Sequence, residues 1–267
     1  MVTTASPDQT IHIKSDYPLV SKQIFEDDNE TGWNDISDAE IGQRIPYRFN
    51  TYAPNMSGYE SYRMIFHDEH DAALTFHPES VRIEITGSDG RVLELSAYQF
   101  EVTQTGDTGF SVEIMDLKKI IDARWPGELD ENKESSYGQS IRLYFEASLN
   151  EKAAEQTGRP GFENRVRLEF SNNPNAGGSE TGFTPWDTVV TFTYRMDSVK
   201  VNEADQVLEG AKFRLYRDAD LRDEVFLKKA ETGTYTVLHN DALTQGSAGE
   251  EMISHADGTF VITGLDQ

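Results

Sequence analysis

FENRVRLEF (162–170) alternates apolar and polar side chains along its whole length. Successive side chains of a β-strand point to opposite faces of the sheet, so alternate residues separate onto two faces. One face carries Phe162, Asn164, Val166, Leu168 and Phe170, and the other carries Glu163, Arg165, Arg167 and Glu169. The face with two acids and two arginines is the one expected to meet water. The pattern therefore predicts a half-buried strand with Asn164 on its buried side.

The same period of two recurs along most of the chain and sets the fold class. The other alternating stretches are RIPYRFNTY (44–52), SYRMIF (61–66), SVRIEIT (80–86), FSVEI (110–114), SIRLYFEASL (140–149) and TVVTFTYRM (188–196). Turn-forming clusters such as TGDTG (105–109) and NNPNAGG (172–178) separate them. MDLKKIIDARW (115–125) alone has helical spacing. Many short strands joined by turns predict an all-β chain built as a β-sandwich rather than as a parallel α/β sheet.

A boundary between two β domains is predicted near residue 196. There the chain restarts with SVKVNEADQVLEGAKFRLYRD (198–218), which has the pattern of a strand, a turn and a second strand. The tail DGTFVITGLDQ (257–267) stops on a turn just after a strand. We expect a linker or the end of a preceding domain over 1–16, a sandwich over 17–196, and a smaller β domain over 197–267 that lacks its last strand.

Composition excludes several classes of function. The chain of 267 residues has 47 acids against 24 bases and a net charge of −23, which opposes binding to nucleic acid or to anionic lipid. Cysteine is absent, so disulfides, thiolate nucleophiles and cysteine metal sites are excluded. No apolar run is long enough to span a membrane, and the N-terminus lacks the pattern of a secretory signal. We expect either an intracellular protein or a piece of a longer one.

Two further charged residues fall on apolar faces. Lys22 alternates with apolar neighbours in PLVSKQI (18–24), and Asp68 follows the apolar positions of SYRMIFHD (61–68). Each has an ordinary structural explanation: a lysine at the rim whose stem reaches water, and a carboxylate that caps a turn in HDEHD (67–71). Asn164 has one too, as a core asparagine that satisfies backbone groups at a strand end.

Together, Lys22, Asp68 and Asn164 also suggest a reaction. A lysine desolvated in an apolar core loses its proton readily and becomes an amine nucleophile. A carboxamide is an electrophile with ammonia as its leaving group, and an acid kept protonated by burial can polarise it and shuttle protons. If the three groups touch, the product is an isopeptide bond between Lys22 and Asn164. Periodicity does not establish that these strands are neighbours.

At these residues the sequence resembles the backbone pilins of sortase-assembled pili on Gram-positive bacteria. The matching blocks are YPLVSKQI (17–24), SDAEIGQRIPYRF (37–49), SYRMIFHDEHDAALTFHPESVRI (61–83), NRVRLEFSNNPN (164–175), TPWDTVVTFTYRMDSVKVNEADQVLEGAKFRLY (184–216) and DGTFVITGLDQ (257–267). The resemblance implies an immunoglobulin-like sandwich of the collagen-adhesin A-type. It also implies a bond from Lys22 to Asn164 assisted by Asp68. Asn172, in SNNPN, is the runner-up acceptor.

The second domain resembles the smaller B-type, prealbumin-like sandwich of the same family. Lys200 stands at that family's first-strand lysine, and the partners that the resemblance implies for it would lie beyond Gln267. The lysine used for pilin polymerisation has no counterpart here, because Tyr17 and Pro18 are followed by Leu19.

The resemblance implies a structural subunit of an extracellular, cell-wall-anchored pilus, with neighbouring pilin subunits and sortase as partners and no cofactor. The chain would not be an enzyme, because a single-turnover crosslink consumes its own side chains. The alternative is a surface adhesin module that binds a host matrix protein or a glycan. A sandwich hydrolase using Asp68 and Glu69 ranks last, because adjacent strand residues face opposite ways.

A metal site and a sugar site are weaker hypotheses. DDNETGWNDISD (27–38) resembles a calcium loop, with Asp27, Asn29, Asp35 and Asp38 as candidate ligands, but strands rather than helices are predicted on both sides. We interpret it as an acidic loop between strands and predict no metal. HDEHD (67–71) is interpreted as a solvated turn. The three tryptophans, Trp33, Trp125 and Trp186, are interpreted as packing residues rather than as a sugar site.

Overall fold

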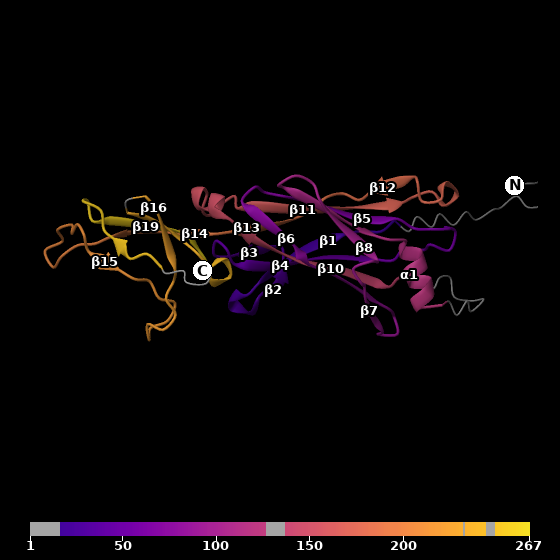
Figure 1. The fold of residues 1–267 in the computed structure, drawn as a ribbon, viewed down its shortest axis with the longest axis horizontal. Coiled ribbons are helices and arrows are strands. Elements are labelled where there is room, and N and C mark those ends of the chain that lie inside the picture. Colours follow the sequence, from indigo (N-terminus) through magenta and orange to yellow (C-terminus); the bar gives the residue numbers. More distant parts are fainter. Residues whose placement is uncertain (1–16, 127–136, 232, 244–248) are drawn as a thin grey trace, which may run out of the picture.

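The computed structural model describes residues 17–126, 137–231, 233–243 and 249–267. The segment 1–16, expected to be a linker or the end of a preceding domain, lies outside the described residues. Two β bodies follow each other along the long axis of the molecule, the larger built from β1 to β13 and the smaller from β14 to β19 (Figure 1). The prediction of an all-β fold is confirmed.

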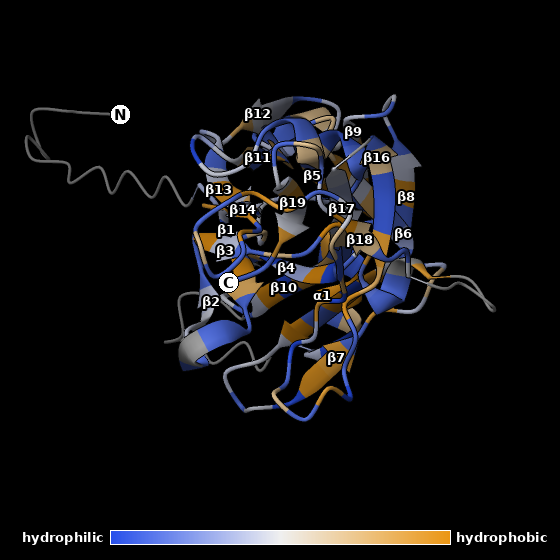
Figure 2. Ribbon diagram, turned by 90° about the vertical axis from the view of Figure 1, so that its left-hand side faces the viewer, coloured by the Kyte–Doolittle hydropathy of each residue, from blue (hydrophilic) through white to orange (hydrophobic). Residues whose placement is uncertain are grey.

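The larger body is a sandwich of two sheets. In the first sheet the strand order is β2-β1-β4-β10-β6-β7, with every neighbouring pair antiparallel. Its strands are β1 (Ser21–Glu26), β2 (Gly32–Asn34), β4 (Arg44–Tyr52), β6 (Leu74–Thr86), β7 (Val92–Glu94) and β10 (Ser140–Leu149). β4 alternates buried and more exposed residues along its whole length. Figure 2 shows hydrophobic and hydrophilic segments side by side on the strands.

The second sheet has the order β3-β13-β11-β5-β9-β8, and β12 also pairs with β11. Its strands are β3 (Ile36–Asp38), β5 (Met64–His70), β8 (Phe100–Gln104), β9 (Gly109–Ile114), β11 (Phe162–Ser171), β12 (Thr181–Phe183) and β13 (Asp187–Phe192). Only β3 and β13 run parallel among these described pairs. β11 is the stretch FENRVRLEF plus Ser171, and its even-numbered residues from Phe162 to Phe170 are buried as predicted.

Helical segments are short. The predicted helical stretch contains α1 (Leu117–Arg124), which buries Leu117, Ile120 and Ile121 against the larger sandwich. The Asp116 side chain caps it by accepting a hydrogen bond from the Lys119 amide. The 3₁₀ turns are η1 (Asp28–Glu30), η2 (Glu151–Glu155), η3 (Pro174–Ala176) and η4 (Asn240–Ala242). Among the described residues, no helix has the length and apolarity to cross a membrane.

The smaller body has one sheet in the order β14-β19-β17-β16 and a separate pair, β15 with β18. Its strands are β14 (Tyr194–Val199), β15 (Lys212–Phe213), β16 (Leu227–Glu231), β17 (Thr234–Val237), β18 (Met252–Ile253) and β19 (Thr259–Leu265). A second, much smaller hydrophobic cluster lies here, including Leu227, Tyr235 and Ile262.

Short polar contacts join the two bodies end to end. The Ile41 amide donates to the Gly264 carbonyl at 3.1 Å, and the His239 amide donates to the Ile41 carbonyl at 2.9 Å. The Arg217 guanidinium also forms an ion pair with Glu40, with 2.6 Å between nitrogen and oxygen. Gly264 has φ of +81°, and a Cβ there would lie 2.7 Å from Ile41 Cδ1, so this joint requires glycine.

Candidate functional site

Lys22 lies in the dry interior of the larger sandwich. It occupies β1 opposite Phe49 of β4, and only 1% of its surface is exposed. Its Nζ lies 4.9 Å from the ring centre of Phe49, 5.4 Å from that of Phe145 and 5.6 Å from that of Tyr47. The alternation that placed this lysine on an apolar face therefore takes its amine into an aromatic cage rather than out to water.

Asp68 and Asn164 come from the facing sheet. In the register of β5 with β11, Asp68 lies opposite Val166 and Asn164 lies opposite His70, so the two residues are diagonal neighbours on the inward face. Both are almost completely buried. The Lys22 Nζ donates hydrogen bonds to Asp68 Oδ2 and to Asn164 Oδ1. The structure thus brings together the three residues singled out from the sequence.

Burial shifts the protonation of this pair toward the neutral forms. Desolvation lowers the pKa of Lys22 to about 8, although the Asp68 carboxylate opposes the shift. Desolvation also raises the pKa of the Asp68 carboxyl, against the opposing effect of Lys22. Both directions favour a proton on Asp68 and a free electron pair on Nζ, which is the state that a nucleophilic amine needs.

Two atoms of the site have no hydrogen-bond partner within the described structure. They are Asn164 Nδ2 and Asp68 Oδ1, and both are buried. A buried polar group left unpaired costs about 1–3 kcal/mol. Expulsion of Nδ2 as ammonia would remove one of these unpaired groups. The arrangement therefore places an amine, a carboxamide and a carboxyl group in contact, with the carboxamide nitrogen left unpaired.

Comparisons with known proteins give a fold. No family model matches the chain. The leucine–tRNA ligase of Campylobacter concisus is 27% identical over 125 residues, which is 45% of this chain and 14% of the ligase. The structural matches are far more extensive. The 35 kDa C-terminal fragment of the major pilin GBS80 of Streptococcus agalactiae has a TM-score of 0.68 at 20% identity, covering 94% of this chain and 80% of the fragment.

Two further pilins match with lower scores. The full-length major pilin RrgB of Streptococcus pneumoniae has a TM-score of 0.58 at 13% identity, covering 98% of this chain and 66% of RrgB. The major pilin subunit BcpA of Bacillus cereus has a TM-score of 0.53 at 17% identity, covering 94% of this chain and 56% of BcpA. This chain has the fold of a Gram-positive backbone pilin. It spans little more than half the length of BcpA and a small part of the ligase.

Within the pilin fold, the two other lysine and asparagine candidates lie away from the site. Asn172 follows the end of β11 and is exposed, and its amide donates to the Glu180 carbonyl at 3.1 Å. The structure therefore does not bring the runner-up acceptor to Lys22. Lys200 lies in the smaller body just after β14, half-buried, with its amide bonded to the Gly258 carbonyl at 2.8 Å.

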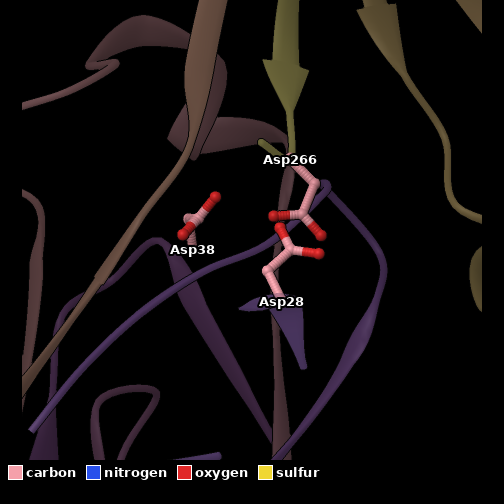
Figure 3. A group of neighbouring side chains, drawn as sticks. All are labelled: Asp28, Asp38 and Asp266. Atoms are coloured by element: carbon pink, nitrogen blue, oxygen red, sulfur yellow. The ribbon is translucent and has the colours of Figure 1, made fainter. Parts of the chain in front are cut away.

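The acidic loop does not gather as the calcium motif would require. Asp27 accepts a hydrogen bond from the Gln43 side chain at 3.2 Å, and the side chain of Asn29 lies outside the described structure. Asp38 instead joins Asp28 and Asp266, whose oxygens lie within 4.8 Å of one another (Figure 3). Burial and a hydrogen bond with Asp38 raise the pKa of the Asp266 carboxyl to about 8. A proton on the Asp266 carboxyl lowers the repulsion among these neighbouring acids. Residue spacing in the sequence held no signal for this cluster, because Asp266 comes from the far end of the chain.

The interpretation of HDEHD as a turn was wrong. β5 continues through His70, because its hydrogen bonds to β11 and β9 extend that far. Asp68 and His70 therefore point inward while His67 and Glu69 point outward, so the five residues cannot ligate one metal ion. The tryptophans have separate partners. Trp125 is buried, the Arg48 guanidinium lies 4.4 Å from the ring centre of Trp33, and the guanidinium groups of Arg165 and Arg167 lie 4.6 and 4.7 Å from that of Trp186.

Proposed function

We propose that this chain is a structural subunit of a surface pilus whose larger sandwich is crosslinked by an autocatalytic isopeptide bond between Lys22 and Asn164. The observation that carries the proposal is the contact of a buried lysine amine with both a buried carboxyl and a buried carboxamide. The pilin fold supports the structural role. On this proposal the partners are neighbouring pilin subunits and sortase, and the location is the cell-wall-anchored pilus.

The reaction balances without a co-reactant. The neutral amine of Lys22 attacks Cγ of Asn164, so that the Nζ–Cγ bond forms and the Cγ–Nδ2 bond breaks. One proton of Nζ passes through Asp68 to the leaving nitrogen, which departs as ammonia, and Asp68 returns to its starting state. Groups held in contact have effective molarities of roughly 10⁵–10⁸ M, which suits a slow amide exchange that happens once. The chain consumes its own side chains and is not a turnover enzyme.

The crosslink would strengthen the domain along the direction of pull. Lys22 and Asn164 are 142 positions apart and belong to opposite sheets. β1 follows the N-terminal end of the described chain, while β13, next to β11, leads into the smaller body (Figure 1). A covalent link between β1 and β11 would carry tension past the strands between them. An amide also survives reductants, which suits a chain without cysteine.

Mass spectrometry of variants tests the proposal. The intact wild-type chain should weigh one ammonia less than its sequence, and a digest should contain Lys22 and Asn164 in one branched peptide. Asn164→Ala should restore the full mass, whereas the matched variant Asn172→Ala, at an exposed asparagine, should keep the deficit. A deficit that persists in Asn164→Ala would overturn the assignment of the acceptor.

A further inference from the structure

His70 is paired across the strands with Asn164, the residue that carries the leaving group of the proposed reaction. It is opposite Asn164 in the register of β5 with β11, and both residues are buried. The Asp71 amide donates to the Glu163 carbonyl at 2.9 Å, which makes His70 and Asn164 a non-hydrogen-bonded pair. Cα atoms in such a pair lie about 4.5 Å apart, with their side chains closer than in the alternate pairs. His70 and Asn164 are therefore nearest cross-strand neighbours on the inward face.

The tautomer of His70 follows from one contact. Its Nδ1 lies 3.0 Å from the backbone carbonyl oxygen of Asp71. A carbonyl oxygen only accepts, so Nδ1 carries the hydrogen, and Nε2 of the neutral ring is left with a free electron pair. Nε2 makes no hydrogen bond to any described residue, yet it is not among the buried atoms that lack a partner. The free acceptor therefore reaches a solvent-accessible space.

A cavity that His70 lines opens at this end of the sandwich. It has a volume of about 310 Å³ and is also lined by the buried side chains of Leu74 and Phe76 and by Asp107 and Lys152. This volume is much larger than the roughly 30 Å³ that a molecule of liquid water occupies.

We propose that His70 is the exit group for ammonia in the crosslinking reaction. This inference rests on the proposed Lys22–Asn164 bond and extends it to the fate of the leaving group. As the Cγ–Nδ2 bond breaks, the departing nitrogen keeps its two hydrogens and gains one through Asp68. Nε2 of His70 accepts a hydrogen bond from this ammonia and passes it to the cavity, where water protonates it. Removal of ammonia prevents the reverse attack on the new amide.

Substitutions separate this role from simple packing. His70→Phe keeps a planar ring of similar size but loses the acceptor, whereas His70→Gln loses the ring but supplies a carbonyl acceptor. His67→Phe is the matched control, because His67 lies on the same strand and points outward, where its ring nitrogen pairs with Glu169 at 2.8 Å. The full chain is made by cell-free translation, and the fraction that has lost ammonia is followed by intact mass over time.

We expect crosslinking in His70→Phe to be about tenfold slower than in the wild type, the effect of one lost hydrogen bond. His70→Gln and His67→Phe should crosslink within about twofold of the wild-type rate by the same measure. A packing role predicts the reverse order of the two His70 variants, and either that order or a wild-type rate in His70→Phe overturns the proposal. If His70→Phe does not fold, His70→Gln tests the proposal by itself. Slow crosslinking in the folded glutamine variant also overturns the proposed role of His70. If the wild type itself never loses ammonia, the crosslink proposal fails first, and that result is distinct from a slow variant.

Discussion

Loss of the crosslink should lower the thermal stability of the larger sandwich by a large and calculable amount. Asn164→Ala removes the acceptor, so the chain folds without the bond. On the loop-entropy model used for disulfides, a link closing 142 positions contributes about 5 kcal/mol to the free energy of unfolding. A change of 1 kcal/mol moves the melting temperature of a domain of this size by about 2–4 °C. The expected fall is therefore about 10–20 °C.

The rest of the substitution contributes little. Without a bond, Asn164 would hold one hydrogen bond from Lys22 and bury an unpaired Nδ2. Alanine would lose the first and remove the second, and these changes of about 1–3 kcal/mol oppose each other. Differential scanning calorimetry of the wild type, Asn164→Ala and the control Asn172→Ala measures the difference. A fall of less than about 3 °C in Asn164→Ala would refute the covalent contribution.

Three further predictions concern the acid and the joint between the two bodies. Asp68→Ala should leave the full sequence mass in the freshly folded chain, because no other buried acid contacts the Lys22 amine among the described residues; a chain that still loses ammonia at the wild-type rate would exclude Asp68 from the reaction. Folding raises the pKa of the Asp266 carboxyl from 3.8 to about 8. Between these two pH values the folded state keeps a proton that the unfolded state has lost. The contribution of this group to the free energy of unfolding is therefore complete below about pH 4 and is lost as the pH rises toward 8. Thermal melts of Asp266→Asn should show a flatter pH dependence than the wild type over this range, and identical profiles would count against a raised pKa of Asp266. Gly264→Ala should destabilise the joint by about 1–2 kcal/mol of backbone strain, in addition to the clash of the new Cβ with Ile41. Limited proteolysis between the two bodies should then be faster than in the wild type. Gly210→Ala is the control, since that glycine also has positive φ but no atom near its missing Cβ; equal proteolysis of both variants would contradict the clash.

The sequence shows which residues of a strand face the core, but it gives little information about which strands lie next to one another. Strict alternation in β11 was enough to place Asn164 inside, because the side chains of a strand must alternate and its other face carries four charged residues from Glu163 to Glu169. Lys22 followed from the same rule. No local pattern could show that β1 lies across the sandwich from β5 and β11, since strand pairing is a long-range property.

Interpretations based on short sequence segments were wrong where tertiary contacts outweighed local propensity. HDEHD has the composition of a turn, but pairing on both sides extends β5 through His70 and turns that side chain inward beside Asn164. The acidic loop was compared with a contiguous calcium motif, whereas its Asp38 meets Asp28 and Asp266. Asp266 approaches only because β19 ends at the joint between the bodies.

The bond length between Lys22 and Asn164 tests the central claim most directly. A crystal structure of the full chain at high resolution measures the separation of Lys22 Nζ from Asn164 Cγ. An amide linkage predicts about 1.33 Å with a planar arrangement of the surrounding atoms, and no density for Nδ2. Separate side chains with Nζ and Cγ at van der Waals distance, about 3 Å or more, and Nδ2 still in place would contradict the crosslink.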